Sequence, residues 1–327
     1  MTDGGAGYLE RVRTALFVLA FVLTACAAAA PRAAPKAEPA SSTTAPRKTK
    51  LFYELEGRAF PLPVVRGTVS GRPTWMLVDT GASSHVIAGW FAKKIGLKLN
   101  RLGDMATDHA GRSVVMSRVD APKVAIDGWG DLADETMVVS DVPPIIEKLG
   151  IGAFISPQKL NETGDAVVLD LRAAEMRTAS FKEAARPEIG VATLIGEGTR
   201  PCLDADSPVS GVAYMARATV GGREAWLLVD TGAERSDLLL GSGPGQALAP
   251  KSVPAKGQMY GASGKLTSRT VRRAAVTVGE LDFVLDLDLI GGESDPHCPR
   301  DGVLSMDVLR KCVLVLGKKQ MVARCVR

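Results

Sequence analysis

One five-residue segment, Val-Asp-Thr-Gly-Ala, occurs twice in this chain and constrains its fold more than any other feature. It occupies residues 78–82 and again residues 229–233, each time at the end of an apolar run that is typical of a β-strand. Each copy therefore delivers a carboxylate, Asp79 or Asp230, into a glycine turn beside an apolar interior. A bare carboxylate is costly in such a place unless hydrogen bonds or a partner stabilise it. The repetition predicts that the two carboxylates partner each other.

The repeat extends well beyond these five residues. When Asp79 is placed on Asp230, an offset of 151 (230 − 79), residues 66–82 share 12 of their 17 positions with residues 217–233. An isolated Asp-Thr-Gly is weak evidence, because turns favour Asp and Gly in any protein. A match of this length indicates instead that a whole lobe has been duplicated.

These motifs resemble those of the retropepsin-like and pepsin-like aspartic peptidases. In that family each lobe carries two hydrophobic residues before Asp-Thr-Gly-Ala or Asp-Thr-Gly-Ser. A later segment, two hydrophobic residues and then Gly, packs beside the catalytic turn. Here the later segments are residues 153–156 and 302–305, with Ser156 and Ser305 where the family has Gly. The resemblance covers the chain from about residue 55 to the C-terminus.

The resemblance implies a mainly β, two-lobed acid-protease fold that arose by internal duplication, with a pseudo-twofold axis and a cleft between the lobes. The N-terminal lobe would span residues 51–187 and the C-terminal lobe residues 188–327. The implied function is that of an aspartic endopeptidase. Asp79 and Asp230 would share one proton, as is established for this family. One carboxylate would then take a proton from water while the other protonates the scissile carbonyl.

The resemblance also implies roles for the residues that follow each catalytic Asp. Thr80 and Thr231 would hydrogen-bond across the lobe interface and hold the two turns together. Gly81 and Gly232 would let the backbone approach closely enough to donate to the carboxylates.

Two polar segments lie where the family has its flap, a hairpin that closes over the substrate. In residues 105–116 the candidates for substrate contact are His109 and Gly111, and in residues 258–265 they are Tyr260 and Gly261. For the first segment the alternative is an ordinary surface hairpin. For the second it is a Tyr260 side chain that merely packs under its hairpin.

The first 26 residues have the features of a lipoprotein signal peptide. Arg11 and Arg13 precede an apolar run at residues 14–25, which is short for a membrane span and suits a secretory signal. The run ends in Leu-Thr-Ala-Cys, which resembles the bacterial lipobox, so Cys26 is predicted to be acylated. The alternative is an ordinary signal peptide in which this Cys is incidental.

Residues 27–50 are predicted to be a disordered tether, because they consist mainly of Ala, Pro, Ser, Thr and Lys and hold little apolar surface. Ala27, not Asp, follows the lipobox Cys. By resemblance to Gram-negative sorting signals, this implies a protein anchored in the outer membrane. We therefore expect a location in a bacterial cell envelope, facing the periplasm or the surface, with the lipid bilayer as a partner.

Four cysteines follow the lipobox, at positions 202, 298, 312 and 325. A two-residue turn at residues 318–319 would place Cys312 directly opposite Cys325 on a hairpin, within disulfide reach. A Cys202–Cys298 bond would complete the set. The alternative is four buried free thiols, which a periplasmic location disfavours.

Two local features complete the secondary-structure expectations. Residues 86–95 have apolar positions near helical spacing, which predicts a helix that ends at Gly96. Residues 241–245 are rich in glycine and are predicted to form a flexible loop, because Pro244 would interrupt a following helix.

Other functions find little support. The three His residues show no metal-ligand spacing, and no Gly-x-Ser-x-Gly segment is present. The formal net charge of +4 is modest, and the basic residues form no stripe interleaved with aromatic residues. We therefore predict a monomer without metal, cofactor or nucleic-acid partner that acts on a peptide or protein. The rival hypothesis is a non-catalytic, peptide-binding envelope lipoprotein, for which Ser156 and Ser305 leave room.

Overall fold

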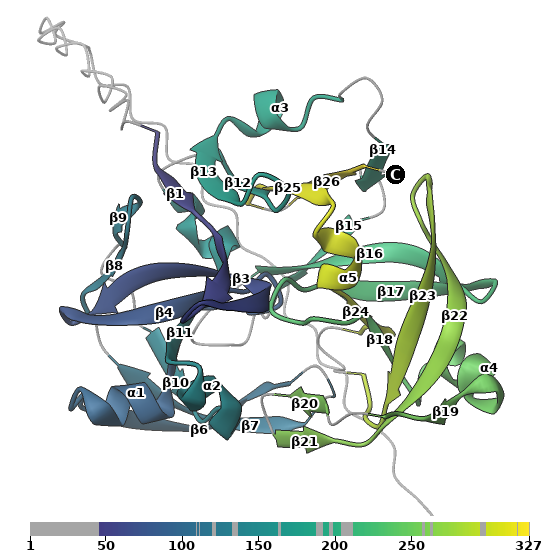
Figure 1. The fold of residues 1–327 in the computed structure, drawn as a ribbon, viewed down its shortest axis with the longest axis horizontal. Coiled ribbons are helices and arrows are strands. Elements are labelled where there is room, and N and C mark those ends of the chain that lie inside the picture. The colour runs from purple at the N-terminus through teal and green to yellow at the C-terminus, as the bar shows by residue number, and fades with distance from the viewer. Residues whose placement is uncertain are drawn as a thin grey trace, which may run out of the picture. The chain divides into compact units, whose positions relative to one another are not determined.

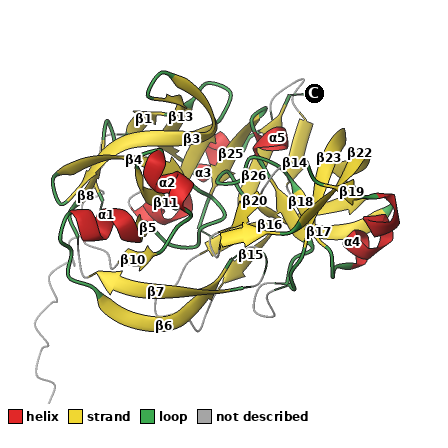
Figure 2. Ribbon diagram, turned by 60° about the horizontal axis from the view of Figure 1, so that its bottom comes forward, coloured by secondary structure: helices red, strands yellow, loops and turns green. Residues whose placement is uncertain are grey.

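The computed structural model describes residues 46–326, except 109, 111, 120–121, 133–136, 163–164, 188–191, 196–198, 204–211, 257–258, 262–263, 295–298 and 319. The described chain is mainly β, as the sequence predicts (Figure 1). Figure 2 shows that its helices are short segments set against the strands. Several predicted features lie outside the described residues, namely Cys26, most of the tether, His109, Gly111 and the Cys202–Cys298 pair.

Two large sheets are each built from one half of the chain, and we call the part around each sheet a lobe. The first-lobe strands are β2 (Phe52–Leu55), β3 (Arg58–Val69), β4 (Arg72–Val78), β5 (Val86–Ala88), β6 (Asn100–Thr107), β7 (Ser113–Val119), β8 (Val124–Ile126), β9 (Gly130–Asp131), β10 (Met137–Ser140) and β11 (Ile151–Ile155). Their order is β6-β7-β10-β5-β11-β4-β3-β8-β9, with β2 beside β3. The tight turn between β3 and β4 holds Ser70 and Gly71, whose φ values of 49° and 74° are those of a two-residue hairpin turn.

The second-lobe strands repeat this plan. They are β15 (Thr199–Leu203), β16 (Val212–Val220), β17 (Arg223–Val229), β18 (Asp237–Leu239), β19 (Val253–Pro254), β22 (Ser268–Val278), β23 (Leu281–Ile290) and β24 (Gly302–Leu304). Their order is β15-β16-β17-β24-β18-β23-β22-β19, and β20 (Met259–Gly261) with β21 (Gly264–Leu266) forms a separate hairpin. In each lobe the strand that leads into Asp-Thr-Gly pairs in parallel with a later strand, β4 with β11 and β17 with β24.

A third sheet takes strands from both halves of the chain. It consists of β1 (Lys48–Lys50), β12 (Ala166–Asp170), β13 (Glu175–Ala179), β14 (Ala192–Ile195), β25 (Cys312–Leu316) and β26 (Met321–Cys325). The order is β1-β13-β12-β25-β26-β14, so β12 of one half pairs with β25 of the other at its centre. The predicted end of the tether at residue 50 is therefore too late, because residues 48–50 already pair with β13.

In the part of the chain that the structure describes, five short α-helices and two 3₁₀ turns connect the strands. They are α1 (Gly89–Lys94), α2 (Pro144–Lys148), η1 (Pro157–Glu162), α3 (Phe181–Ala184), α4 (Gly243–Leu248), η2 (Ala249–Lys251) and α5 (Met306–Leu309). Within the described ranges, none of the helices has the length and apolar character needed to cross a membrane.

Two local predictions are wrong for identifiable reasons. Residues 86–88 form strand β5, not the start of a helix, because they pair with β10 and β11 and bury Ile87 and Ala88 completely. The helix that follows does end before Gly96, whose φ is 74°. Residues 243–245 begin helix α4, where Pro244 lies in the first turn and needs no intrahelical N–H partner. The Ser242 hydroxyl caps this helix by accepting from the Gly245 N–H at 3.1 Å.

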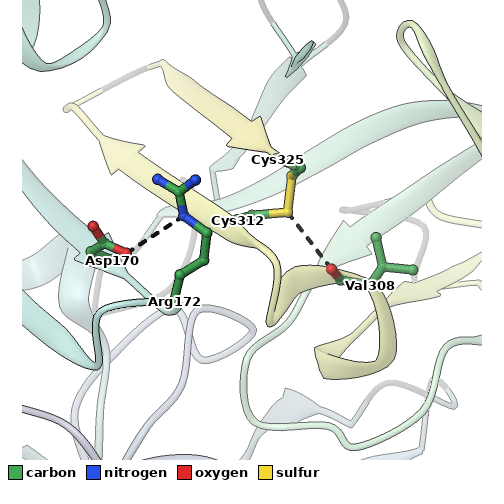
Figure 3. The surroundings of a disulfide bond; sticks show 5 residues. All are labelled: Asp170, Arg172, Val308, Cys312 and Cys325. Carbon is green, nitrogen blue, oxygen red and sulfur yellow. Dashed lines mark hydrogen bonds and ion pairs between the residues drawn. A yellow bond between two sulfur atoms is a disulfide. The ribbon is translucent and has the colours of Figure 1, made fainter. Parts of the chain in front are cut away.

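The closing hairpin carries the disulfide expected from its register. Cys312 lies directly opposite Cys325, and the two are bonded (Figure 3). The Gly317 N–H donates to the Gln320 carbonyl at 2.8 Å, which closes the hairpin around its two-residue turn. Both cysteines are buried, and Sγ of Cys312 lies 3.7 Å from the Val308 carbonyl oxygen. The bond therefore ties the two strands of the last hairpin together in the core of the shared sheet.

Candidate active site

Each Asp-Thr-Gly turn begins where a buried strand ends. Asp79 follows β4, and its N–H donates to the Ile155 carbonyl at the end of β11, at 2.9 Å. Asp230 follows β17, and its N–H donates to the Leu304 carbonyl at the end of β24, at 3.0 Å. The same backbone hydrogen bond therefore fixes both carboxylate-bearing turns to the later segment of their own lobe.

The two threonines after the aspartates join the lobes. The Thr80 N–H donates to the Thr231 hydroxyl oxygen at 3.1 Å, and the Thr231 N–H donates to the Thr80 hydroxyl oxygen at 3.0 Å. In turn, the Thr80 hydroxyl donates to the Val229 carbonyl at 2.7 Å, and the Thr231 hydroxyl to the Val78 carbonyl at 2.6 Å. Both side chains are completely buried. The four reciprocal bonds hold the two turns in one fixed arrangement.

The glycine of each turn lies against the carboxyl group of the other lobe. A Cβ atom on Gly81 would come within 2.6 Å of the Asp230 carboxyl carbon, and one on Gly232 within 2.6 Å of the Asp79 carboxyl carbon. Any larger residue would collide with the dyad, so close approach explains both glycines. Within each turn the Gly81 N–H donates to Oδ1 of Asp79 at 2.8 Å, and the Gly232 N–H to Oδ1 of Asp230 at 2.6 Å.

The two carboxyl groups interact electrostatically. Burial raises the pKa of Asp79 well above its usual range, and the neighbouring Asp230 carboxylate and the hydrogen bond between the two side chains raise it further. The Ala82 and Gly81 N–H groups oppose this rise by stabilising the ionised form. The pair therefore retains a shared proton at pH values where an isolated aspartate is ionised.

Side chains that the sequence reasoning missed support the serines beside each turn. His85 and Ser236 occupy equivalent positions at the offset of 151. Nδ1 of His85 accepts from the Ser156 N–H at 3.1 Å, and Oγ of Ser236 accepts from the Ser305 N–H at 3.0 Å. The hydroxyl oxygens of Ser156 and Ser305 are themselves buried and make no hydrogen bond within the described residues.

Two further side chains, Gln158 and Asp307, occupy equivalent positions in the two lobes but make different contacts. Nε2 of Gln158 lies 3.0 Å from the Thr80 carbonyl oxygen, 2.9 Å from that of Ala82 and 2.7 Å from that of Val212. At the equivalent position of the second lobe, the carboxylate of Asp307 accepts from the N–H and the hydroxyl of Ser236. The offset of 149 that aligns Ser156 with Ser305 would have revealed this pair as well.

The second hairpin carries two of the residues predicted to contact substrate. Tyr260 lies on β20 with 47% of its surface exposed, and Gly261 is buried at the hairpin turn opposite Gly264. A role for either residue in substrate binding stays a prediction. Within the described part of the chain, no three His, Cys, Asp or Glu side chains are arranged to hold a metal ion.

The close contacts of Gly81 and Gly232 predict that a methyl group added at either residue lowers the stability of the fold. Gly81→Ala and Gly232→Ala should each lower the free energy of unfolding by roughly 1–3 kcal/mol, because the methyl group overlaps the carboxyl of the other lobe. Urea unfolding measures this. Gly291→Ala is the matched control, since a Cβ there meets no atom within 4 Å and should leave stability unchanged or slightly higher. Equal costs at all three positions would contradict the proposed collision.

The buried His85 predicts a loss of stability in acid. Burial and the nearby Lys159 lower its pKa from 6.5 to about 3, so between these values the unfolded chain takes up a proton that the folded protein does not. This contribution to stability is complete above pH 6.5 and is lost as the pH falls towards 3, with a slope of up to about 1.4 kcal/mol per pH unit.

The variant His85→Asn tests this, because its side-chain oxygen can accept from the Ser156 N–H but does not titrate. Urea unfolding from pH 7 to pH 4 should show a shallower loss of stability for the variant than for the wild type. Parallel curves would show that His85 does not contribute to the acid sensitivity.

Comparison with known proteins gives one family match. Residues 65–153 match the family model described as aspartyl protease. Among solved structures, the crystal structure of the aspartic proteinase from Irpex lacteus aligns with 12% sequence identity and a TM-score of 0.45, covering 86% of this chain and 97% of that chain. A search of curated proteins finds no match. The resemblance to the aspartic peptidases is therefore supported through residues 65–153, which contain the first Asp-Thr-Gly turn.

Proposed function

We propose that this protein is an aspartic endopeptidase whose water-activating pair is Asp79 and Asp230. One observation carries the proposal: each carboxyl group lies against the glycine of the opposite turn, while the buried threonines lock the two turns together. Two carboxyl groups held side by side and half-buried are costly for folding. A shared-proton pair that hydrolyses peptide bonds gives this arrangement a chemical purpose.

The proposed reaction is a general acid–base hydrolysis without a covalent intermediate. The ionised member of the pair takes a proton from a water molecule as the water oxygen attacks the scissile carbonyl carbon. The protonated member donates its proton to the carbonyl oxygen, which gives a neutral tetrahedral intermediate. Collapse of the intermediate then transfers a proton to the leaving amine and breaks the carbon–nitrogen bond. The raised pKa of Asp79 supports this scheme, because it keeps a proton in the pair at mildly acidic pH.

A peptide-binding protein without catalysis is the second candidate. The observation in its favour is the pair of serines, Ser156 and Ser305, that replace the family's Gly beside the two catalytic turns. Their side chains add two buried hydroxyl groups without hydrogen bonds to the region that supports the dyad. Measurement of peptide cleavage separates the two candidates directly.

Replacing either aspartate tests the enzyme proposal. Asp79→Asn and Asp230→Asn should each reduce the rate of peptide hydrolysis by roughly 10²–10⁴-fold or more, because each removes the shared-proton pair while nearly preserving shape. Cleavage of a peptide library, with and without a pepstatin-type inhibitor, measures the effect. The exposed Asp127, changed to Asn, is the control and should leave the rate unchanged. Near-normal turnover in either dyad variant would rule out the two-aspartate mechanism.

We further propose that the enzyme is tethered to a bacterial membrane by an acyl group on Cys26. The lipobox-like segment that ends at this residue supports the proposal. The variant Cys26→Ser removes the acylated thiol, so the protein should leave the membrane fraction or remain unprocessed. Fractionation of cells that express the full chain measures this. Retention of a processed variant in the membrane fraction would contradict the anchor.

A further inference from the structure

A groove lies where the first described strand leads from one sheet to another. Lys48 and Lys50 of β1 pair with β13 in the shared sheet, and Phe52 of β2 then pairs with β3 in the first lobe (Figure 1). The groove has a volume of about 590 Å³ and is lined by these three residues, by Arg66 on β3 and by residues of two turns. We call it the β1 groove. It lies at the end of the predicted tether, because the described chain begins at residue 46.

Hydrogen bonds tie the walls of the β1 groove to one another. The Thr49 hydroxyl donates to the Asp127 carbonyl at 2.5 Å, and the Leu51 N–H donates to the Ala174 carbonyl at 2.8 Å. The Asp127 N–H in turn donates to the Arg66 carbonyl at 3.0 Å. The groove is therefore a preformed part of the fold, built from strands and the turns beside them.

Two cations lie around the Phe52 ring at the wall of the groove. Nζ of Lys50 lies 5.3 Å from the centre of this ring, and the guanidinium carbon of Arg66 lies 5.4 Å from it. The same guanidinium lies 4.8 Å from the centre of the Trp75 ring. Both cations are exposed, and within the described residues neither forms an ion pair. The aromatic rings therefore hold the two charges in place without neutralising them.

The equivalent arginine of the second lobe is neutralised. Arg217 occupies the position of Arg66 at the offset of 151, and its Nε donates to Oε2 of Glu224 at 2.9 Å. In the first lobe Pro73 stands at the position of Glu224, so this carboxylate is missing from the β3–β4 hairpin. The difference between the lobes leaves a positive charge at the β1 groove that its counterpart lacks.

Two carboxylates also line the groove, and one of them is already paired. Glu175 forms ion pairs with Lys48 and with Arg177. Asp127 is exposed and forms no ion pair within the described residues, so its carboxylate opposes the binding of an anion. Two unpaired cations against one unpaired carboxylate still leave the groove with a net positive charge.

The chain that leads to the groove is basic as well and keeps it near the proposed anchor. Residues 27–50 contain one acidic residue and five basic residues, namely Arg32, Lys36, Arg47, Lys48 and Lys50. The 24 residues (50 − 26) from Cys26 to Lys50 span at most about 85 Å even when fully extended. Basic residues held this close to a bilayer are attracted to its anionic lipids.

We propose that the β1 groove docks on a bilayer by binding the phosphate of an anionic phospholipid headgroup between Lys50 and Arg66. The inference rests on the proposed acyl anchor at Cys26 for its setting, whereas headgroup binding is a property of the folded part. Phosphate suits the groove because its oxygens accept hydrogen bonds from both a guanidinium and an ammonium group. The acyl group holds the chain to the membrane, and the groove sets which face of the folded part lies against it.

Cosedimentation of the full chain with lipid vesicles tests the proposal without the acyl group. In the Cys26→Ser background, vesicles of phosphatidylcholine with phosphatidylglycerol should bind the protein more tightly than vesicles of phosphatidylcholine alone, and added NaCl should reduce the difference. Lys50→Gln and Arg66→Gln should each lower the affinity for the anionic vesicles about fivefold, and together roughly twentyfold. The signal segment is the same in every variant, so its own affinity for lipid cancels.

Variants that retain both cations make the result specific. Pro73→Glu supplies the carboxylate that Arg217 has in the second lobe, and should weaken binding to the anionic vesicles. Asp127→Asn removes the opposing carboxylate and should strengthen binding. Arg66→Lys retains the charge and should bind nearly as tightly as the wild type, which separates loss of charge from loss of packing on the two rings.

The matched controls are Arg217→Gln and Lys94→Gln. Arg217 has the same strand position but is paired, and Lys94 is an exposed lysine 5.7 Å from the centre of the Trp90 ring, outside the groove. Both should leave the affinity for anionic vesicles nearly unchanged. An equal loss in these controls overturns the proposal, because net charge alone would then explain it. Equal affinities of the wild type and the variant that lacks both groove cations overturn it too.

The outcomes also separate the docking from the anchor. If the groove variants lose affinity as expected but a processed Cys26→Ser protein stays in the membrane fraction of cells, the docking stands and the acyl anchor fails. If Cys26→Ser leaves the membrane fraction but all vesicle affinities are alike, the anchor stands and the docking fails. Fractionation at high salt, which weakens headgroup binding, prevents one effect from masking the other.

Discussion

The geometry of the dyad depends on the reciprocal hydrogen bonds between Thr80 and Thr231. Each hydroxyl accepts from the N–H of the opposite threonine and donates to a carbonyl of the opposite strand, and both side chains are shielded from water. In such a closed set the loss of one hydroxyl leaves two buried backbone groups without partners, which costs more than one average hydrogen bond. The turns therefore keep one relative position, and the approach of each glycine to the opposite carboxyl follows from it.

The two lobes share the backbone arrangement of the site but differ in the side chains that hydrogen-bond to it. His85 and Gln158 hold the first turn, while Ser236 and Asp307 occupy the same positions in the second. The buried His85 and the dyad residue Asp79 both make the stability of the fold depend on pH. The lowered pKa of His85 makes the fold less stable as the pH falls from 6.5 towards 3, whereas the raised pKa of Asp79 makes it less stable as the pH rises above 3.8. The two effects oppose each other in mildly acidic solution.

The sequence predicts well those features that are repeated in the two halves of the chain or that depend on neighbouring residues. The dyad and its turns follow from the duplication, and the closing hairpin and its disulfide follow from a register that one turn fixes. The prediction fails where pairing with strands distant in sequence determines the secondary structure. Residues 86–88 carry a helix-like pattern but lie between two strands that are distant in sequence. The link from Arg300 to Asp108 joins residues 192 positions apart and follows no pattern that spacing could reveal.

Among the described residues, the contacts between the two lobes differ in how readily they can open. The shared sheet joins β12 to β25 through a backbone ladder in the core, and the threonine bonds are completely buried. Opening either one would expose apolar surface and several unpaired backbone groups together. The hairpin of β6 and β7 contacts the second lobe instead through separate hydrogen bonds, from Arg300 to Asp108, from Glu293 to Ala110 and from Arg112 to Lys265. Such separate bonds can break one at a time, whereas the sheet ladder and the threonine bonds open only together with the core around them.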